Sequence, residues 1–380
     1  MRKISIYCGL AVLFLIALVT GCGEDGAGGV AEPAYFDETD VFVSQTNGYE
    51  TYRIPSLIVT AGGTVLAFCE GRKAGSSDTG DIDIVLRRSR DSGVTWGSMS
   101  VVIDNGADTA GNPCPVVDRD TGTIWLPFTT NLGTDTESEI IHGTSEGTRE
   151  VFIIKSTDDG LTWSEPVNIT DDVKPAGWTW YATGPGRGIQ LAGGRFVIPC
   201  NHVETGLFPA QSCHSRSHVI YSDDHGETWD IGGVLDGKTN ESQVAELDDG
   251  TLIINMRSYR GRRRAVSRSY DAGMTWDPVT LDRALIEPVC QGSLISHDGF
   301  LFFSNPASWT RMRMTVRRSS DNGVSWEISK VLNEGPAAYS ALSALPNTNI
   351  ACLYEKGDLK KIRLYDRIVL ARFSMEWLTN

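Results

Sequence analysis

One eight-residue pattern occurs five times in this chain of 380 residues, and it constrains the fold more than any other feature. The pattern is Ser-x-Asp-x-Gly-x-(Thr/Ser)-Trp. Its copies span residues 89–96, 156–163, 222–229, 269–276 and 319–326. Spacings of roughly 50 to 65 residues indicate that one supersecondary unit is repeated along or around the molecule.

Each copy of the pattern has the chemistry of a hairpin turn. The Asp side chain accepts backbone N–H groups of its own turn, the Gly supplies a positive φ, and the Trp packs inward. A strand-like run precedes each copy, at residues 82–86, 150–154, 217–221, 264–267 and 312–316. This alternation predicts a β-propeller in which each blade carries one such turn.

The two ends of the chain supply a further blade. Residues 350–354 and 367–373 look like strands without a good copy of the turn, and a strand near residues 40–44 is expected to close the ring against them. With 41% hydrophobic residues and 40 glycines, the chain suits one large all-β domain. We therefore predict a six-bladed β-propeller, with residues 134–138 as an exposed loop.

The N-terminus is predicted to be a targeting signal. Arg2 and Lys3 precede the apolar run 10–19, which is shorter than the usual membrane span of about 20 residues. Small residues before Cys22 resemble the lipobox of bacterial lipoproteins, in which this cysteine is acylated. The alternative is an ordinary cleaved signal with an incidental cysteine.

These features predict three parts of the chain. Residues 1–21 form the lipoprotein signal peptide, 22–37 a flexible tether, and 38–380 the propeller. The protein is expected to be exported and lipid-anchored in the bacterial cell envelope, touching the membrane only through its anchor.

Charge and cysteine usage exclude some classes of function. The formal charge of −14 becomes −16 once Arg2 and Lys3 are removed with the signal, so nucleic-acid binding through the overall field is not expected. Besides Cys8 and Cys22, six cysteines are spread through predicted strands as buried residues, although Cys200 and Cys213 also suit a disulfide. His214 and His218 alone lie four apart, and neither a metal nor another cofactor is expected.

Polar residues outside the repeated turns carry the chemistry. They comprise several arginines, two or three acids and one tyrosine, with one or two in each predicted blade. Arginine presents a planar donor fork that matches a carboxylate. Several arginines that converge in an acidic protein indicate a small anionic ligand held by its carboxylate, while the run from Arg260 to Arg268 is expected to be solvated or salt-bridged.

From about residue 38 to its end, the chain resembles the exo-sialidases (neuraminidases) of bacteria, which are similar to the mammalian enzymes. The repeated turn matches the family's Asp box, and Tyr52-Arg53-Ile54-Pro55 matches its Arg-Ile-Pro motif. The resemblance implies a six-bladed propeller with five Asp-box turns. It also implies hydrolysis of terminal α-linked sialic acids with retention of configuration, and no cofactor.

The resemblance also assigns the substrate-binding arginines. Arg53 and Arg257 match two members of the arginine triad that grips the substrate carboxylate. Arg311 is the third, in competition with Arg313 and Arg317. Arg72 resembles an arginine that contacts the sugar ring near its 4-hydroxyl.

Three catalytic residues follow from the same resemblance. Tyr339 matches the nucleophile, because a neutral phenol avoids repulsion by the carboxylate on the anomeric carbon. Glu241, rather than Glu246, matches the base that takes the phenol's proton. Asp78 matches the acid/base, with Asp81 and Asp83 as alternatives, and nearby arginines are expected to favour the phenolate.

Further residues and other functions remain in view. Trp178, Trp180 and Tyr181 are candidates for the pocket that holds the N-acyl and glycerol groups, or for packing, and Gln291 is a weaker candidate. The expected partners are sialylated glycans, glycoproteins or gangliosides, bound by a monomer. The alternatives are a sialic-acid-binding propeller without catalysis, a scaffold propeller, a trans-sialidase, or a hydrolase of a related nonulosonic acid.

Overall fold

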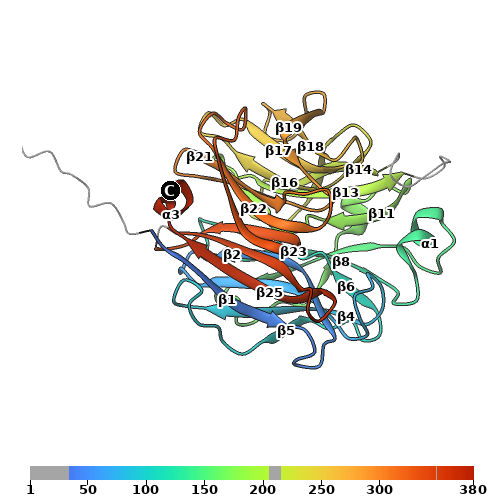
Figure 1. Cartoon of the computed structure of the whole chain (residues 1–380). Coiled ribbons are helices and arrows are strands. Elements are labelled where there is room, and N and C mark those ends of the chain that lie inside the picture. The colour runs from blue at the N-terminus through green and yellow to red at the C-terminus, as the bar shows by residue number, and fades with distance from the viewer. Residues whose placement is uncertain (1–33, 205–214, 348) are drawn as a thin grey trace, which may run out of the picture. The chain divides into compact units, whose positions relative to one another are not determined.

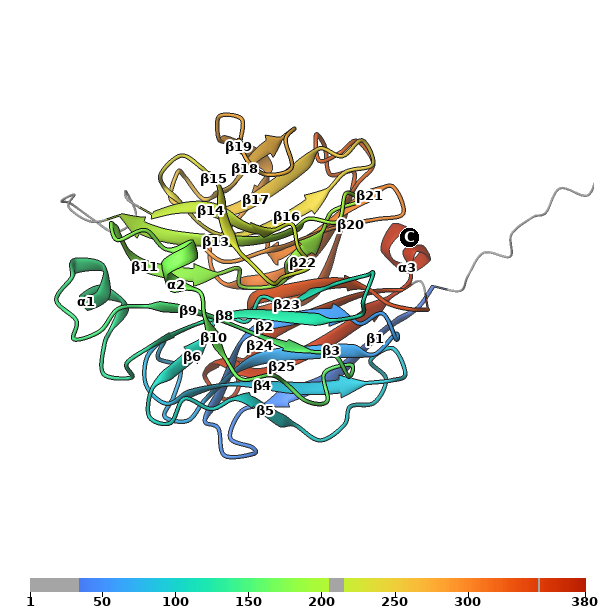
Figure 2. The same ribbon diagram turned by 180° about the vertical axis from the view of Figure 1, so that it is seen from behind.

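Antiparallel strands form nearly all of the regular structure in a computed structural model, which describes residues 34–204, 215–347 and 349–380 (Figures 1 and 2). The strands make up four sheets. In spatial order, the first sheet contains β1 (Phe36–Val43), β25 (Arg363–Phe373), β24 (Ile350–Asp358), β23 (Ile328–Ala344), β22 (Met312–Ser319), β21 (Phe300–Pro306) and β20 (Ser293–His297).

The remaining sheets follow the chain more closely. The second contains β2 (Thr51–Val59), β3 (Val65–Arg72), β4 (Ile82–Ser89), β5 (Ser100–Ile103), β6 (Thr109–Gly111), β7 (Val116–Val117), β8 (Ile124–Asn131), β9 (Glu150–Ser156) and β10 (Val167–Asn168). The third contains β11 (Trp178–Thr183), β12 (Ile189–Gln190), β13 (Phe196–Glu204), β14 (Ser215–Ser222) and β15 (Asp230–Val234). The fourth contains β16 (Thr239–Glu246), β17 (Leu252–Ser258), β18 (Arg263–Ser269) and β19 (Thr280–Ile286).

The two larger sheets are joined groups of antiparallel strands. Strand β23 pairs with β22 through its first half and with β24 through its second half. Strands β4 and β6 meet in a single parallel pair, Ile82 with Thr109. Inner strands also contact one another without pairing. The contacts of β2 with β23, β7 with β12, and β16 with β20 join different sheets, whereas β2 meets β7, and β20 meets β23, within one sheet.

The first and last strands of the described chain pair with each other. Strand β1 runs antiparallel to β25, with Phe36 opposite Phe373 and Val43 opposite Arg367, so the predicted closure of the two ends is confirmed (Figure 1). The strand begins at Phe36, two residues before the predicted boundary at 38.

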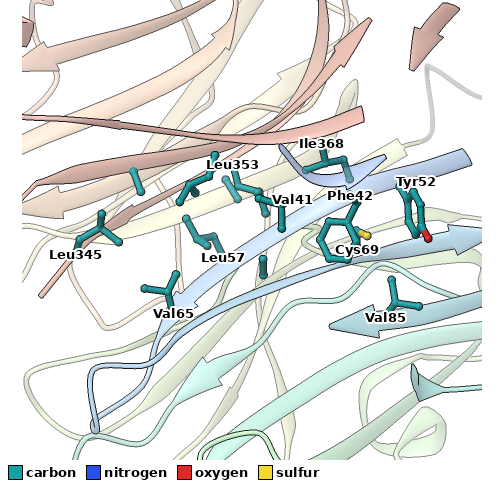
Figure 3. Packing of buried hydrophobic residues seen from close by; sticks show 14 of the residues in the cluster. Val41, Phe42, Tyr52, Leu57, Val65, Cys69, Val85, Leu345, Leu353 and Ile368 are labelled. Carbon is teal, nitrogen blue, oxygen red and sulfur yellow. The ribbon is translucent and has the colours of Figure 1, made fainter. Parts of the chain in front are cut away.

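A hydrophobic cluster unites the two ends of the chain. Figure 3 shows Val41, Phe42 and Leu57 packed against Leu353 and Ile368, all of them buried. Apolar side chains on one face of each strand meet at this interface because side chains alternate along a strand. The described residues form one compact unit.

The five repeated turns have one common geometry. In the first, Ser89 Oγ donates to Asp91 Oδ1 at 2.7 Å, and Asp91 accepts from the Thr95 backbone N–H at 2.9 Å and its hydroxyl at 2.5 Å. The glycines have φ between 75° and 93°, and the residue before each also has a positive φ. The tryptophans pack against buried clusters, and each preceding run lies in a strand, as predicted.

The described residues contain three short helices, α1 (Glu137–His142), α2 (Thr170–Val173) and α3 (Met375–Thr379). Helix α1 replaces part of the loop expected at residues 134–138. Thr136 and Glu139 form a capping box, and Gly143 ends the helix at φ 67°. Asp135 is also buried there, where it accepts from the backbone N–H groups of Glu146 and Gly147.

Several expectations lie outside the described residues: the signal peptide, Cys22, residues 22–33 of the tether, Cys213 and His214. Five cysteines within the described ranges are buried and unpaired, as predicted for core residues: Cys69, Cys114, Cys200, Cys290 and Cys352. Among the described helices, none has the length and hydrophobicity needed to span a membrane.

Candidate active site

A cavity of 370 Å³ brings together all seven residues predicted for catalysis and substrate binding. Its lining includes Arg53, Arg72, Asp78, Glu241, Arg257, Arg311 and Tyr339. The segments that supply these side chains are far apart in the sequence. They meet because inner strands from different sheets present the same end to this cavity.

Irregular pairing marks the strands that carry the central residues. Register shifts occur in β2 between Arg53 and Ser56, in β16 between Thr239 and Ser242, and in β23 between Ala337 and Ser340. A bulge turns side chains away from the regular alternation of a strand. Arg53, Glu241 and Tyr339 lie at or within these shifts, so each is aimed by a local break in the sheet.

Tyr339, Glu241 and Arg257 form a connected group. The Tyr339 hydroxyl donates to Glu241 Oε1 at 2.5 Å, and Arg257 Nη1 donates to Glu241 Oε2 at 2.8 Å. Arg257 Nη1 also lies 3.2 Å from the Tyr339 oxygen. The phenol therefore has a carboxylate ready to take its proton and a guanidinium beside the same oxygen.

Glu355 of β24 holds Arg53 in place and was not found by sequence reasoning. Its carboxylate accepts from Arg53 Nε at 2.8 Å, and from the backbone N–H groups of Ile54 at 2.9 Å and Tyr339 at 3.0 Å. The side chain is fully buried. One carboxylate thus fixes the arginine and the backbone of the tyrosine relative to each other.

Arg311, Arg313 and Arg317 were the candidates for the third arginine of the predicted triad, and of these only Arg311 lines the cavity. Its Nη1 donates to the Tyr365 hydroxyl at 2.9 Å, and its guanidinium lies 5.4 Å from the Tyr339 ring centre. Arg313 pairs with Glu334 at 3.1 Å on the surface. Arg317 donates to Asn305 at 3.0 Å.

Asp78 lies at the side of the cavity beside two arginines. Its Oδ1 is 2.8 Å from Arg72 Nη1 and 3.8 Å from Arg53 Nη1, and its side chain is 59% exposed. The alternatives Asp81 and Asp83 both pair with Lys73, at 2.8 and 3.2 Å, and neither lines the cavity.

The electrostatic environment acts in opposite directions on the tyrosine and the aspartate. Burial raises the pKa of Tyr339 well above its usual value, and Glu241 adds to this, although Arg257 and Arg311 oppose it. The arginines alone therefore do not produce the phenolate. Burial also favours the neutral form of Asp78, but Arg72 and Arg53 outweigh it and lower the pKa.

Two of the lower-priority pocket residues lie elsewhere. Trp180 lines the cavity. Tyr181 is instead buried in a core cluster, where its hydroxyl lies 3.0 Å from His218 Nε2. Successive residues of a strand point to opposite faces, so both side chains cannot enter one pocket. Gln291 is buried behind Tyr339, where its amide bonds the backbone of Ser340 in both directions.

Two further predicted candidates also lie away from the cavity. Trp178 stacks on His202 with 3.4 Å between ring centres. Glu246 accepts from the Ala192 N–H at 2.8 Å, at the far end of β16 from Glu241.

Sequence reasoning missed several residues that line the cavity: Glu70, Asn112, Glu137, Arg149, Asn201, Asn240 and Tyr259. The Arg149 guanidinium lies over the Trp180 ring, 4.0 Å from its centre, and Arg149 Nη1 donates to Asn131 Oδ1 at 2.7 Å. Burial lowers its pKa to about 10. The pairing of a buried arginine with a cavity tryptophan has no local sequence signal, because the two residues lie 31 positions apart.

The Arg260–Arg268 run is divided between core and surface. Arg264 is fully buried, pairs with Glu287 at 2.7 Å and donates to Asn255 at 2.6 Å. Asp118, Asp120 and His225 are close enough together to share a metal ion, but none of them lines the cavity.

Comparisons with known proteins agree with this geometry. The family model of the BNR repeat-like domain matches residues 63–352. The chain is 36% identical to a sialidase of Micromonospora viridifaciens over 91% of its own length, and 35% identical to a sialidase of Bacteroides fragilis over 80%. It spans 55% and 60% of those two relatives, respectively.

A solved structure shares the fold closely. The microbial sialidase Hz136 superposes with a TM-score of 0.81 at 32% identity, covering 90% of this chain and 69% of that one.

Proposed function

Because the chain belongs to the sialidase family, we propose that it is a retaining exo-sialidase that hydrolyses terminal α-linked sialic acids from glycoconjugates. The observation that carries this proposal is the contact between the Tyr339 hydroxyl and Glu241, with Arg257 beside both. A tyrosine nucleophile is the recognised exception among retaining glycosidases.

Arg53, Arg257 and Arg311 are proposed to bind the substrate carboxylate. All three lie around the Tyr339 ring, and Arg53 and Arg311 are 5.2 and 5.4 Å from its centre. Guanidinium groups bind a carboxylate through paired N–H donors, so they orient the sugar as well as attract it. The anomeric carbon would then lie next to the phenol oxygen.

Glu241 is proposed to act as the general base for the nucleophile. As the phenol oxygen attacks the anomeric carbon, its proton passes to Glu241 Oε1 over the 2.5 Å contact. The bond to the departing alcohol breaks, and a tyrosyl glycoside forms. In the second step water attacks the same carbon, and the tyrosine recovers its proton from Glu241.

Asp78 is proposed as the acid that protonates the departing oxygen and then as the base for the water. In the free enzyme Arg72 and Arg53 lower its pKa. The carboxylate of a bound substrate would neutralise part of the positive charge on Arg72 and Arg53, and the substrate would cover the exposed side chain of Asp78. Both effects raise the pKa of Asp78. Substrate binding therefore prepares Asp78 to donate a proton. Arg72 would contact the ring near its 4-hydroxyl, and Trp180 would line the N-acyl side.

The architecture is proposed to be a six-bladed propeller with five Asp-box turns. Cross-sheet contacts among the inner strands and the pairing of β1 with β25 support a closed ring. Export through residues 1–21, acylation at Cys22 and attachment to the cell envelope are proposed from the sequence alone, as is a monomeric state.

The proposal is tested with the 4-methylumbelliferyl α-glycoside of N-acetylneuraminic acid. Wild type should release the fluorophore with EDTA present, and Tyr339→Phe and Glu241→Ala should each lose about 10²–10⁴-fold in kcat. Proton NMR should detect the α-anomer of the sugar as the first product. A folded wild type without turnover would favour a binding propeller, and the β-anomer as first product would exclude retention.

A further inference from the structure

A second cavity, of 570 Å³, lies at the opposite ends of the strands that build the candidate active site. Strand β2 supplies Arg53 near its start and Val59 at its end, and β23 supplies Tyr339 and then Ala344. Strands β7, β12, β16 and β20 also contribute their last residues to this cavity. Because these strands point the same way, the two cavities face opposite ends of the ring; we call this second one the rear cavity.

Residues 184–186, Gly-Pro-Gly, lie between the two cavities. The Gly186 carbonyl accepts from Ser56 Oγ at 2.5 Å, and the Pro185 carbonyl accepts from Gln243 and Gln291, both at 3.3 Å. A Cβ at Gly186 would lie 2.6 Å from the Gln243 amide, so this segment fills the space between the strands. The rear cavity is thus separate from the candidate active site.

Arg187 follows this segment directly and lines the rear cavity. Within the part of the chain that the structure describes, its guanidinium makes no ion pair and no hydrogen bond, and burial lowers its pKa. The neighbouring thiol of Cys114 has its own pKa raised by burial, so it supplies no counter-charge. Arg187 is half-buried, so its unpaired guanidinium is open to an anion that enters the rear cavity.

Most of the other polar groups in the lining are already engaged, and the Glu246 carboxylate, which also lines the rear cavity, accepts from the Ala192 N–H at 2.8 Å. Arg119 donates to the Leu191 carbonyl at 2.9 Å, and Gln190 donates to Asp118 at 3.2 Å. Much of the remaining wall is aliphatic, including Ile58, Val116, Ile189, Val244 and Ile295. Such a wall offers few free hydrogen-bond partners to the hydroxyl groups of a sugar, whereas an alkyl chain needs none.

We propose that the rear cavity binds a small organic carboxylate with an apolar body, with Arg187 as its anchor. The carboxylate would take two N–H groups of the planar guanidinium, and the apolar body would lie against the aliphatic strand ends. The cavity would be a ligand site distinct from the one that holds the substrate.

Octanoate is a suitable probe, and isothermal titration of the full chain measures its binding. Saturating N-acetylneuraminic acid keeps the probe away from Arg53, Arg257 and Arg311. One octanoate per chain should bind, more tightly than acetate, which lacks the apolar body, and more tightly than octanol, which lacks the charge. Equal binding of acetate, or of inorganic phosphate, would overturn the assignment of an amphiphilic ligand. No octanoate binding would overturn the site altogether.

Arg187→Met removes the charge but keeps an unbranched side chain, and should weaken octanoate binding at least about tenfold. Arg187→Lys keeps the charge without the planar pair of N–H donors and should give an intermediate affinity. Arg313→Met is the matched control, because Arg313 pairs with Glu334 on the surface and should leave the affinity unchanged. Full affinity in folded Arg187→Met would refute the anchor.

Discussion

The tyrosine at the centre of the site is held in its neutral form until a base acts on it. Burial and the neighbouring carboxylate raise the pKa of Tyr339, and Glu241 lies 2.5 Å from the phenol oxygen. The proton therefore has one short path, and in the proposed mechanism it leaves as the new bond forms. A freely ionised phenolate next to Glu241 would place two negative charges together, which the buried site disfavours.

Two arginines that are one residue apart should differ sharply in their effect on turnover. Arg311 lines the cavity, whereas Arg313 pairs with Glu334 at the surface. Arg311→Ala should lower kcat/KM by about 10²-fold or more, because the proposed charged contact to the substrate carboxylate would be lost. Arg313→Ala should remain within about twofold of wild type. Equal losses in steady-state assays of both variants would contradict the assignment.

Single side chains were predictable where a motif or a strand pattern identified them. Arg53 belongs to the Arg-Ile-Pro motif and Tyr339 was matched to the family's nucleophile, and the structure places both in the cavity. Tyr181 was placed in the pocket together with Trp180, although strand alternation sends neighbours to opposite faces. Glu355 lies 302 positions from Arg53 and follows no motif, so only the three-dimensional structure reveals the pair.

At the level of elements, the turns were predictable because they carry their own chemistry. Five Ser, Asp and Gly sets make the same local contacts without help from the rest of the fold, as Ser156, Asp158 and Gly160 illustrate. The bulges of β2, β16 and β23 were not predictable. They depend on how each strand pairs with its neighbour, and no residue type in these strands announces a register shift.

The turn aspartates should make stability fall in acid. Hydrogen bonds from the Thr95 side chain and backbone lower the pKa of Asp91 to about 2, and Thr162 acts likewise on Asp158. A carboxylate whose pKa is lower in the folded state stabilises the fold above its unfolded value near 4, and this contribution disappears as the pH falls towards 2.

Urea unfolding midpoints measured between pH 6 and pH 2 check this expectation. Wild type should lose stability over that range, and the difference between wild type and Asp158→Asn should shrink towards acid. The exposed Asp223 pairs with Arg195 outside the Ser–Asp–Thr contacts, so Asp223→Asn serves as the control. A constant difference between wild type and Asp158→Asn at every pH would contradict the role of the charge.

On the scale of the molecule, the pairing of β1 with β25 makes stability depend on both ends of the chain. Phe42 is buried between them, in the cluster that also contains Leu57 and Leu353. Phe42→Ala should lower the free energy of unfolding by about 3–5 kcal/mol, because it leaves a cavity at this junction. Phe36 is 38% exposed, and its replacement by alanine should cost far less.

Denaturant titrations followed by fluorescence and circular dichroism measure both variants. The two signals should change together in a single transition, since the terminal strands belong to the same sheet as β20–β24. A small loss in Phe42→Ala, or separate transitions in wild type, would show that the junction contributes little to holding the ends together.

The Gly-Pro-Gly segment at residues 184–186 has a kinetic consequence. Because this segment closes the space behind Tyr339, substrate, water and products would all enter and leave the candidate active site through one opening. In the proposed reaction, the alcohol fragment must depart before water takes its place, and the freed sugar leaves last. Such an ordered release implies that free sugar, as the final product, competes with fresh substrate, so product inhibition should be purely competitive.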